Sequence, residues 1–182
     1  MDKRDVLRYL AALLVVFCLG CGAALGLRAY DAHMDSPAPL TGGQTLDLAA
    51  FGFTLRAPES FTLYDVTQDN LAAGGDALFA GCAAGDGQAL YFYCYGNEQG
   101  DDIGDYGEQE LVTYYTGAGC SAVRTREFGG RRFICYSAQV ERDGEIQTWH
   151  SFETWDERMQ LVFETQMAQS DVLPMLATLQ FN

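Results

Sequence analysis

The chain has 182 residues, with 25 acidic residues against 11 basic ones. Seven of the basic residues and 23 of the acidic ones lie in residues 29–182, so this region carries a net charge of −16. Such a charge repels phosphate backbones and anionic lipid head groups, which argues against nucleic acid as a partner and against peripheral adhesion to a bilayer.

The N-terminal segment is apolar. From Tyr9 to Leu27 the chain has nineteen residues without a charge, and a helix of that length covers about 28 Å, close to the thickness of a bilayer core. Three basic residues precede this run and only Arg28 follows it, which predicts a cytoplasmic N-terminus. We therefore expect residues 1–28 to be a membrane anchor or lipoprotein signal, with a C-terminal domain outside the cytoplasm.

Cys21 decides between two kinds of tether. The sequence Gly20-Cys21-Gly22 is similar to a bacterial lipobox, in which the cysteine receives a diacylglycerol group. Cys18 stands where the lipobox usually has leucine, and the apolar run continues to Leu27, as an uncleaved signal anchor would. Lipid attachment at Cys21, an uncleaved single-pass anchor and an ordinary cleaved signal all remain open.

Residues 29–44 have the composition of a spacer. Pro37, Pro39, Gly42 and Gly43 interrupt regular structure in this stretch, which is typical of a flexible tether. The folded domain is therefore expected to cover residues 45–182.

The domain begins with an alternating pattern. Phe53 and Leu55, then Phe61 and Leu63, alternate with polar neighbours on either side of Pro58. This pattern predicts a hairpin or a pair of strands around the Pro58 turn.

A second hairpin is expected at Asp86-Gly87, a favourable turn sequence between the runs ALFAGCA and QALYFYCYG. In the second run, alternation places Leu90, Phe92 and Cys94 on one face and Tyr91, Tyr93 and Tyr95 on the other. Tyrosine rings on one face could stack on sugars or anchor a protein partner, which makes these three tyrosines aromatic binding candidates. The alternative is that a helix buries them.

The rest of the domain is predicted to contain further strands and two helices. The pattern predicts a helix over 105–115, strands over 121–128 and 131–140 joined by Gly129-Gly130, further strands over 145–153 and 159–167, and a final helix over 170–179 capped by Ser170 and Asp171. The fold class is therefore α+β, with an antiparallel sheet of about six to eight strands and helices packed on it.

The segment GFTLRAPESF, from Gly52 to Phe61, resembles the opening of PsbP-like domains. The later order of a helix, a long meander and a short C-terminal helix before TLQF is similar too. The resemblance covers 46–182 and implies an α/β/α sandwich that acts as a non-enzymatic interaction module, such as those of bacterial surface lipoproteins. It carries no catalytic residue to this chain.

Four cysteines lie in the expected domain: Cys82, Cys94, Cys120 and Cys135. An even number of cysteines outside the cytoplasm makes disulfides a natural hypothesis. Reflection about the two hairpin turns separates Cys82 from Cys94 and Cys135 from Cys120, while a bond such as Cys94 with Cys135 stays open. The alternative is that all four are small buried apolar residues.

The acidic run NEQGDDIGDYGEQE contains the oxygen ligands that calcium prefers. Asp101, Asp102 and Asp105 are weak metal candidates within it, but their spacing does not match an EF-hand. A solvated loop that enters a helix explains the same residues, and we expect no metal or other cofactor.

Enzyme signatures are few. His33 and His150 are the two histidines, and the sequence contains neither GxSxG, HExxH nor a phosphate loop. A small cell-surface hydrolase built on His150 is the alternative to the main expectation. That expectation is a membrane-tethered extracytoplasmic binding or assembly module, with an envelope protein or a glycan as its partner.

Overall fold

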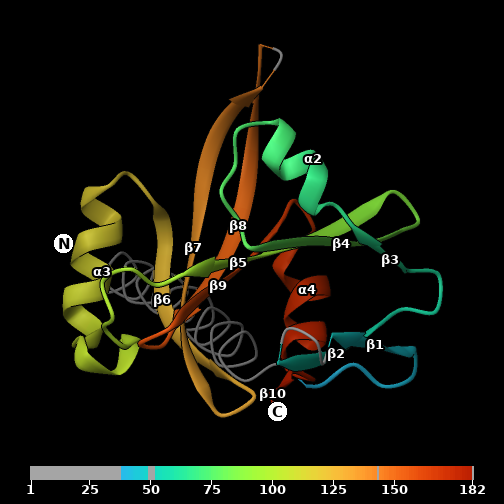
Figure 1. Cartoon of the computed structure of the whole chain (residues 1–182), viewed down its shortest axis with the longest axis horizontal. Helices are drawn as coiled ribbons and strands as arrows, with labels where there is room; N and C mark the ends of the chain where they lie inside the picture. Colours follow the sequence, from blue (N-terminus) through green and yellow to red (C-terminus); the bar gives the residue numbers. More distant parts are fainter. Residues whose placement is uncertain (1–37, 49–51, 143, 182) are drawn as a thin grey trace, which may run out of the picture. The chain divides into compact units, whose positions relative to one another are not determined.

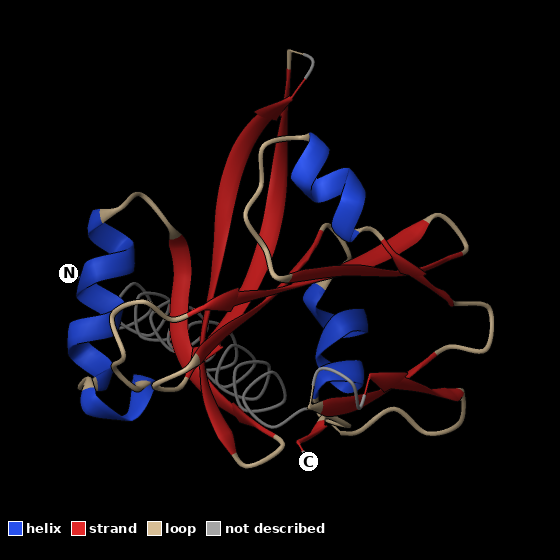
Figure 2. Ribbon diagram, viewed as in Figure 1, coloured by secondary structure: helices blue, strands red, loops and turns tan. Residues whose placement is uncertain are grey.

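Two antiparallel sheets and three α-helices make up the part of the chain that the structure describes, residues 38–48, 52–142 and 144–181. The structure is a computed structural model. The expected α+β class, with antiparallel strands and helices, is confirmed (Figure 2). The membrane segment with Cys21, and most of the tether, lie outside the described residues.

The larger sheet has seven strands, within the expected range. Each strand runs antiparallel to its neighbours, and the β7–β8 pair forms the longest hairpin (Figure 1). In spatial order the strands are β3 (Thr62–Asp65), β4 (Phe79–Gly85), β5 (Gln88–Gly96), β9 (Met159–Thr165), β8 (Glu145–Trp155), β7 (Arg131–Arg142) and β6 (Ser121–Phe128).

The smaller sheet has the order β1 (Gln44–Leu48), β2 (Phe53–Ala57) and β10 (Gln180–Phe181). The expected pairing around Pro58 is wrong, because β2 pairs with β1 and β10 while β3 belongs to the larger sheet. The alternation identified both strands correctly but could not identify their partners. Phe53 and Leu55 are fully buried, and the chain crosses from one sheet to the other at Pro58.

Three α-helices accompany the sheets: α2 (Thr67–Ala72), α3 (Glu108–Gly117) and α4 (Gln169–Leu176), with a 3-10 turn at Ile103–Asp105 before α3. The two expected helices are confirmed with shifted ends, and α2 was not expected. The expected cap of the last helix is wrong. Ala168 is its N-cap residue, without a side-chain bond, and Ser170 donates to Asp171 within the first turn.

The two faces of the larger sheet differ in chemistry. One face, which we call the phenylalanine face, carries Phe92, Phe133, Phe152 and Phe163, all fully buried. Phe53 of the smaller sheet packs edge-on against this face. The opposite face, the tyrosine face, carries Tyr91, Tyr93 and Tyr95, which are half-buried. Helix α3 lies over its β6 end, where Leu111 packs with Ile134 (Figure 1).

The β4–β5 hairpin turns at Asp86-Gly87 as expected, with both residues at positive φ. Reflection of the sequence about Asp86 predicts Cys82 opposite Leu90 and Cys94 opposite Leu78. The register differs from this by one residue, because Cys82 pairs with Tyr91 and Cys94 with Phe79. Since a shift of one residue exchanges the faces of a strand, Cys82 lies on the tyrosine face and not opposite Leu90.

Gly81 is required by the packing of the phenylalanine face. A Cβ at this position would lie 2.2 Å from the ring of Phe92, a ring held by three other phenylalanines. We expect Gly81→Ala to lower the free energy of unfolding by about 1–2 kcal/mol, measured by urea denaturation. Gly117→Ala is the matched control, because a Cβ there meets nothing within 4 Å. Equal stability of both variants would contradict the prediction.

Candidate functional site

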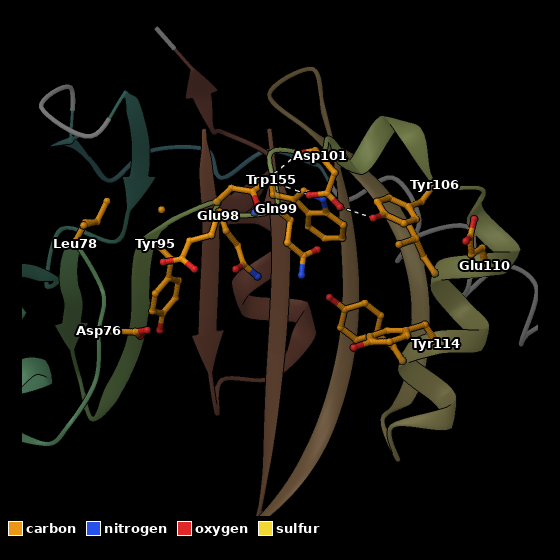
Figure 3. A pocket seen from close by; sticks show the side chains of 15 residues that line it. Asp76, Leu78, Tyr95, Glu98, Gln99, Asp101, Tyr106, Glu110, Tyr114 and Trp155 are labelled. Carbon is orange, nitrogen blue, oxygen red and sulfur yellow. Dashed lines mark hydrogen bonds between the residues drawn. The ribbon is translucent and has the colours of Figure 1, made fainter. Parts of the chain in front are cut away.

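A cleft of about 1080 Å³ opens on the tyrosine face, between the end of β5, the loop that follows it and helix α3 (Figure 3). The ends of β8 and β9 contribute Trp155 and Gln160 to it. We call it the larger cleft. Asp76 and Leu78, which precede β4, complete the lining, so the walls come from four parts of the chain: 76–78, 95–101, 106–115 and 155–160.

Aromatic rings form much of the larger cleft: Tyr95, Tyr106, Tyr114, Tyr115 and Trp155. Tyr106 packs edge-on against Trp155 at 6.0 Å between ring centroids, and Tyr114 against Tyr115 at 5.4 Å. Tyr114 is 72% exposed, which is unusual for so large a ring and leaves its face open to a ligand.

The polar lining is acidic. Asp76, Glu98, Asp101 and Glu110 line the larger cleft, together with the amides of Asn97, Gln99 and Gln160. Among the fifteen described residues that line it, none is Lys, Arg or His (Figure 3). The larger cleft therefore combines open aromatic surface with carboxylates that no basic residue of the lining neutralises.

Asn97 holds the loop that forms one rim. Its side-chain amide donates to the backbone oxygens of Asp101 and Asp156, both at 2.8 Å, and its oxygen accepts from Gln99 N at 3.1 Å. The Tyr106 hydroxyl donates to the Asp101 carboxylate. This bond, and a second one that the Asn97 amide donates to the Asp101 carboxylate at 3.1 Å, hold the pKa of Asp101 below its usual range, so this rim is anionic at neutral pH.

A buried carboxylate lies behind the cleft wall. Glu153, which is 7% exposed, accepts hydrogen bonds from Tyr115 at 2.8 Å, from Tyr136, and from Gln160 at 3.3 Å. Burial, then the nearby Glu153 charge, raises the pKa of both tyrosines. The network joins α3, β7 and β9 through a single side chain and thereby orients two cleft residues.

Glu164 is a second carboxylate on this face. Burial first, and then repulsion from Glu153, raise the pKa of Glu164 above its usual value of 4.5. The folded protein therefore holds this proton more tightly than the unfolded chain, so ionisation of Glu164 destabilises the fold above the raised pKa, and stability increases as the pH falls toward 4.5.

We expect Glu164→Gln to be more stable than the parent protein at pH 7, because the amide cannot ionise. The difference should shrink as the pH falls through the raised pKa toward 4.5. Urea denaturation across that range measures it. Glu127→Gln, a change at an exposed position, is the control, and a difference that does not depend on pH would contradict the prediction.

A smaller cleft of about 700 Å³ lies at the other end of β5. Tyr91 and Trp149 pack at 6.0 Å between ring centroids in its wall, beside three glutamines and Asp171. The three tyrosines predicted from the sequence are therefore divided. Tyr95 lines the larger cleft, Tyr91 lines the smaller one, and Tyr93 lines neither.

The sequence pattern does not identify the aromatic residues of α3 and its approach as site residues. Helical spacing alone accounts for Tyr114 and Tyr115, and the acidic run that contains Tyr106 points only to oxygen ligands. One signal could have identified Tyr114, because a large aromatic side chain on the exposed face of a short helix is a candidate binding residue. Nothing local indicates that this helix packs against β6 and β7 and faces the end of β5 across the cleft.

The four cysteines of the domain are free thiols. Cys94 and Cys135 lie on β5 and β7, which are separated by β9 and β8. Three strand spacings amount to about 14 Å, well beyond the reach of a disulfide. Cys82 lies on β4, next to one edge of the sheet, and Cys120 immediately precedes β6, the opposite edge strand. The structure therefore brings no candidate pair together.

The three metal candidates serve as local hydrogen-bond acceptors. Asp102 accepts from Gly104 N at 2.6 Å, and Asp105 accepts from Asp102 N at 3.1 Å, which forms a capping box for the 3-10 turn. Asp101 is bonded to Tyr106 and Asn97. In the described part of the chain, no three His, Cys, Asp or Glu side chains are grouped to hold a metal ion.

His150 contacts a hydroxyl but not an acid. Its Nδ1 lies 2.8 Å from Ser137 Oγ and 3.5 Å from Gln169 Nε2, and burial lowers its pKa. Ser137 is only 6% exposed, and neither residue lines either of the two clefts. Within the described residues no carboxylate hydrogen-bonds this imidazole, so a substrate-accessible triad is not assembled.

None of the helices in residues 38–48, 52–142 and 144–181 has the length and apolar character needed to cross a membrane. The anchor expected in residues 1–28 lies outside these ranges.

Comparison with known proteins identifies a fold and no family. No family model matches the chain, and no curated protein matches it. A crystal structure of a protein from Bacteroides thetaiotaomicron is similar, with a TM-score of 0.52 and 9% sequence identity over 78% of this chain. The chain spans about half of that protein's length, 49%. At this identity the likeness concerns the fold alone.

Proposed function

We propose that this protein is a non-enzymatic binding or assembly module, tethered to the membrane outside the cytoplasm, and that the larger cleft holds its ligand. The observation that carries the proposal is the cleft itself: about 1080 Å³ lined by five aromatic rings and without a basic residue among its described lining. Concave sites with aromatic walls and a few polar groups are the usual form of binding sites.

The proposal includes a PsbP-like arrangement of the domain. Support comes from the layers: α3 contacts the tyrosine face, while the smaller sheet packs on the phenylalanine face and α4 contacts β2. Placement outside the cytoplasm rests on the apolar run from Tyr9 to Leu27 and the basic residues before it. Intact mass of the membrane-extracted protein tests the tether, since loss of residues 1–20 with an added acyl mass indicates lipid on Cys21.

The binding proposal is tested with the immobilised full chain, exposed to envelope proteins and to a set of glycans. Tyr114→Ala removes the most exposed ring of the cleft and should abolish retention of the ligand. Tyr64→Ala is the matched control, because Tyr64 is 51% exposed but lies on β3, outside both clefts. A ligand that both variants retain would overturn the proposal, as would a ligand that both lose.

A further inference from the structure

We infer that the larger cleft binds an extended polypeptide segment rich in Lys and Arg. The inference rests on the proposed function and names the class of its ligand. Three properties of the cleft carry it: the sign of its charge, the aromatic rings that lie among its carboxylates, and its size.

Charge is the first property. The cleft gathers four carboxylates, and its described lining contains no basic side chain to neutralise them. Burial first, then the charges of Glu164 and Asp76, raise the pKa of Tyr95, which shows that Asp76 lies near this phenol. With a net charge of −16 over residues 29–182, the whole domain attracts cations, and a cleft concentrates that field.

The aromatic rings are the second property. Tyr95, Tyr114 and Trp155 stand among the carboxylates from three different elements (Figure 3). Ring faces attract the guanidinium of Arg and the ammonium of Lys, and the stems of both side chains pack on apolar surface. Carboxylates beside open rings therefore favour a long cationic side chain over a small hydrated metal ion.

Size is the third property. At about 1080 Å³ the cleft lies at the upper end of the range usual for small-ligand sites, roughly 300–1,000 Å³, so it has room for a segment of a polymer. Gln99 and Gln160 add amide groups suited to a peptide backbone. An anionic polymer would be repelled, and a neutral glycan would leave the carboxylates without counter-charges.

The test uses the full chain kept soluble with a polyoxyethylene detergent. Only two tryptophans occur in the sequence, so Trp149→Phe leaves Trp155 as the single fluorescent reporter of the larger cleft. The probe is a short peptide of alternating Lys and Gly. We expect the peptide to shift the Trp155 emission when it binds. Its affinity should fall as salt is added. The same peptide with acetylated lysines should not bind.

Two triple variants separate the cleft from the overall charge. The cleft variant combines Asp76→Asn, Glu98→Gln and Glu110→Gln. Its affinity for the peptide should be lower by about tenfold or more. The control is Glu59→Gln, Glu127→Gln and Glu145→Gln, at exposed positions outside both clefts, and it should bind nearly as the parent does. Thermal unfolding of both variants checks that each remains folded.

Equal weakening by both triple variants would overturn the inference, because binding would then follow net charge. Equal binding of the acetylated peptide, or no binding of the Lys peptide, would overturn it as well. A neutral oligosaccharide that shifts the Trp155 emission while the Lys peptide does not would overturn the cationic ligand and leave the proposed binding function standing. Failure of the proposed binding function is detected separately. It would appear as a captured ligand that the Tyr114→Ala variant still retains.

Discussion

Replacing Phe53 with alanine is expected to lower the free energy of unfolding by about 3–5 kcal/mol, the usual cost of truncating a fully buried phenylalanine. Phe53 has no exposed surface. Its ring contacts those of Phe92 and Phe163 at centroid distances of 5.9 and 5.6 Å, and it approaches Phe181 of β10 at 6.3 Å. One side chain thus joins the smaller sheet to the larger one.

The cavity left by Phe53→Ala would weaken the contact with the larger sheet and the contact with β10 at once. The expected loss of unfolding free energy is therefore large for a single substitution. Urea denaturation measures it. Ile146→Ala is the matched control, because Ile146 is 71% exposed, and its truncation should change stability by no more than about 0.5 kcal/mol. A loss below about 1.5 kcal/mol for Phe53→Ala would show that the two sheets are held together elsewhere.

Replacing Glu153 with alanine is expected to lower the free energy of unfolding by about 2–4 kcal/mol. The carboxylate accepts hydrogen bonds from Tyr115 and Tyr136, and a buried hydroxyl left without a partner costs about 1–3 kcal/mol. Two hydroxyls lose their acceptor, but both tyrosines are only half-buried, so water can replace part of the loss.

The same change should lower the pKa of Glu164, because Glu153 is the charge that adds to burial in raising it. Following the Glu164 carboxyl carbon by NMR while the pH is varied measures this directly. Glu145→Ala, at an exposed position, serves as the control for both measurements. If Glu153→Ala leaves stability and the Glu164 pKa unchanged, the network does not join α3 to the sheet.

Local chemistry made several parts of the fold predictable. Asp86-Gly87 and Gly129-Gly130 form the expected turns because their residues adopt positive φ. Alternation sorted β5 correctly, with Phe92 buried on one face and Tyr93 half-buried on the other. Each of these features depends on neighbours in the sequence, so the sequence by itself determined them.

Non-local contacts decided the site. The sequence identified Tyr91 and Tyr95 as one patch, but Tyr95 shares a cleft with residues of α3 while Tyr91 packs on Trp149 in a separate cleft. Tyr114 becomes a cleft residue only because α3 packs through Leu111 on Ile134. Cys94 and Cys135 are kept apart by the two strands inserted between theirs. Periodicity states which face a side chain takes, whereas its partners depend on which strands and helices pair in space, and only the tertiary structure decided that.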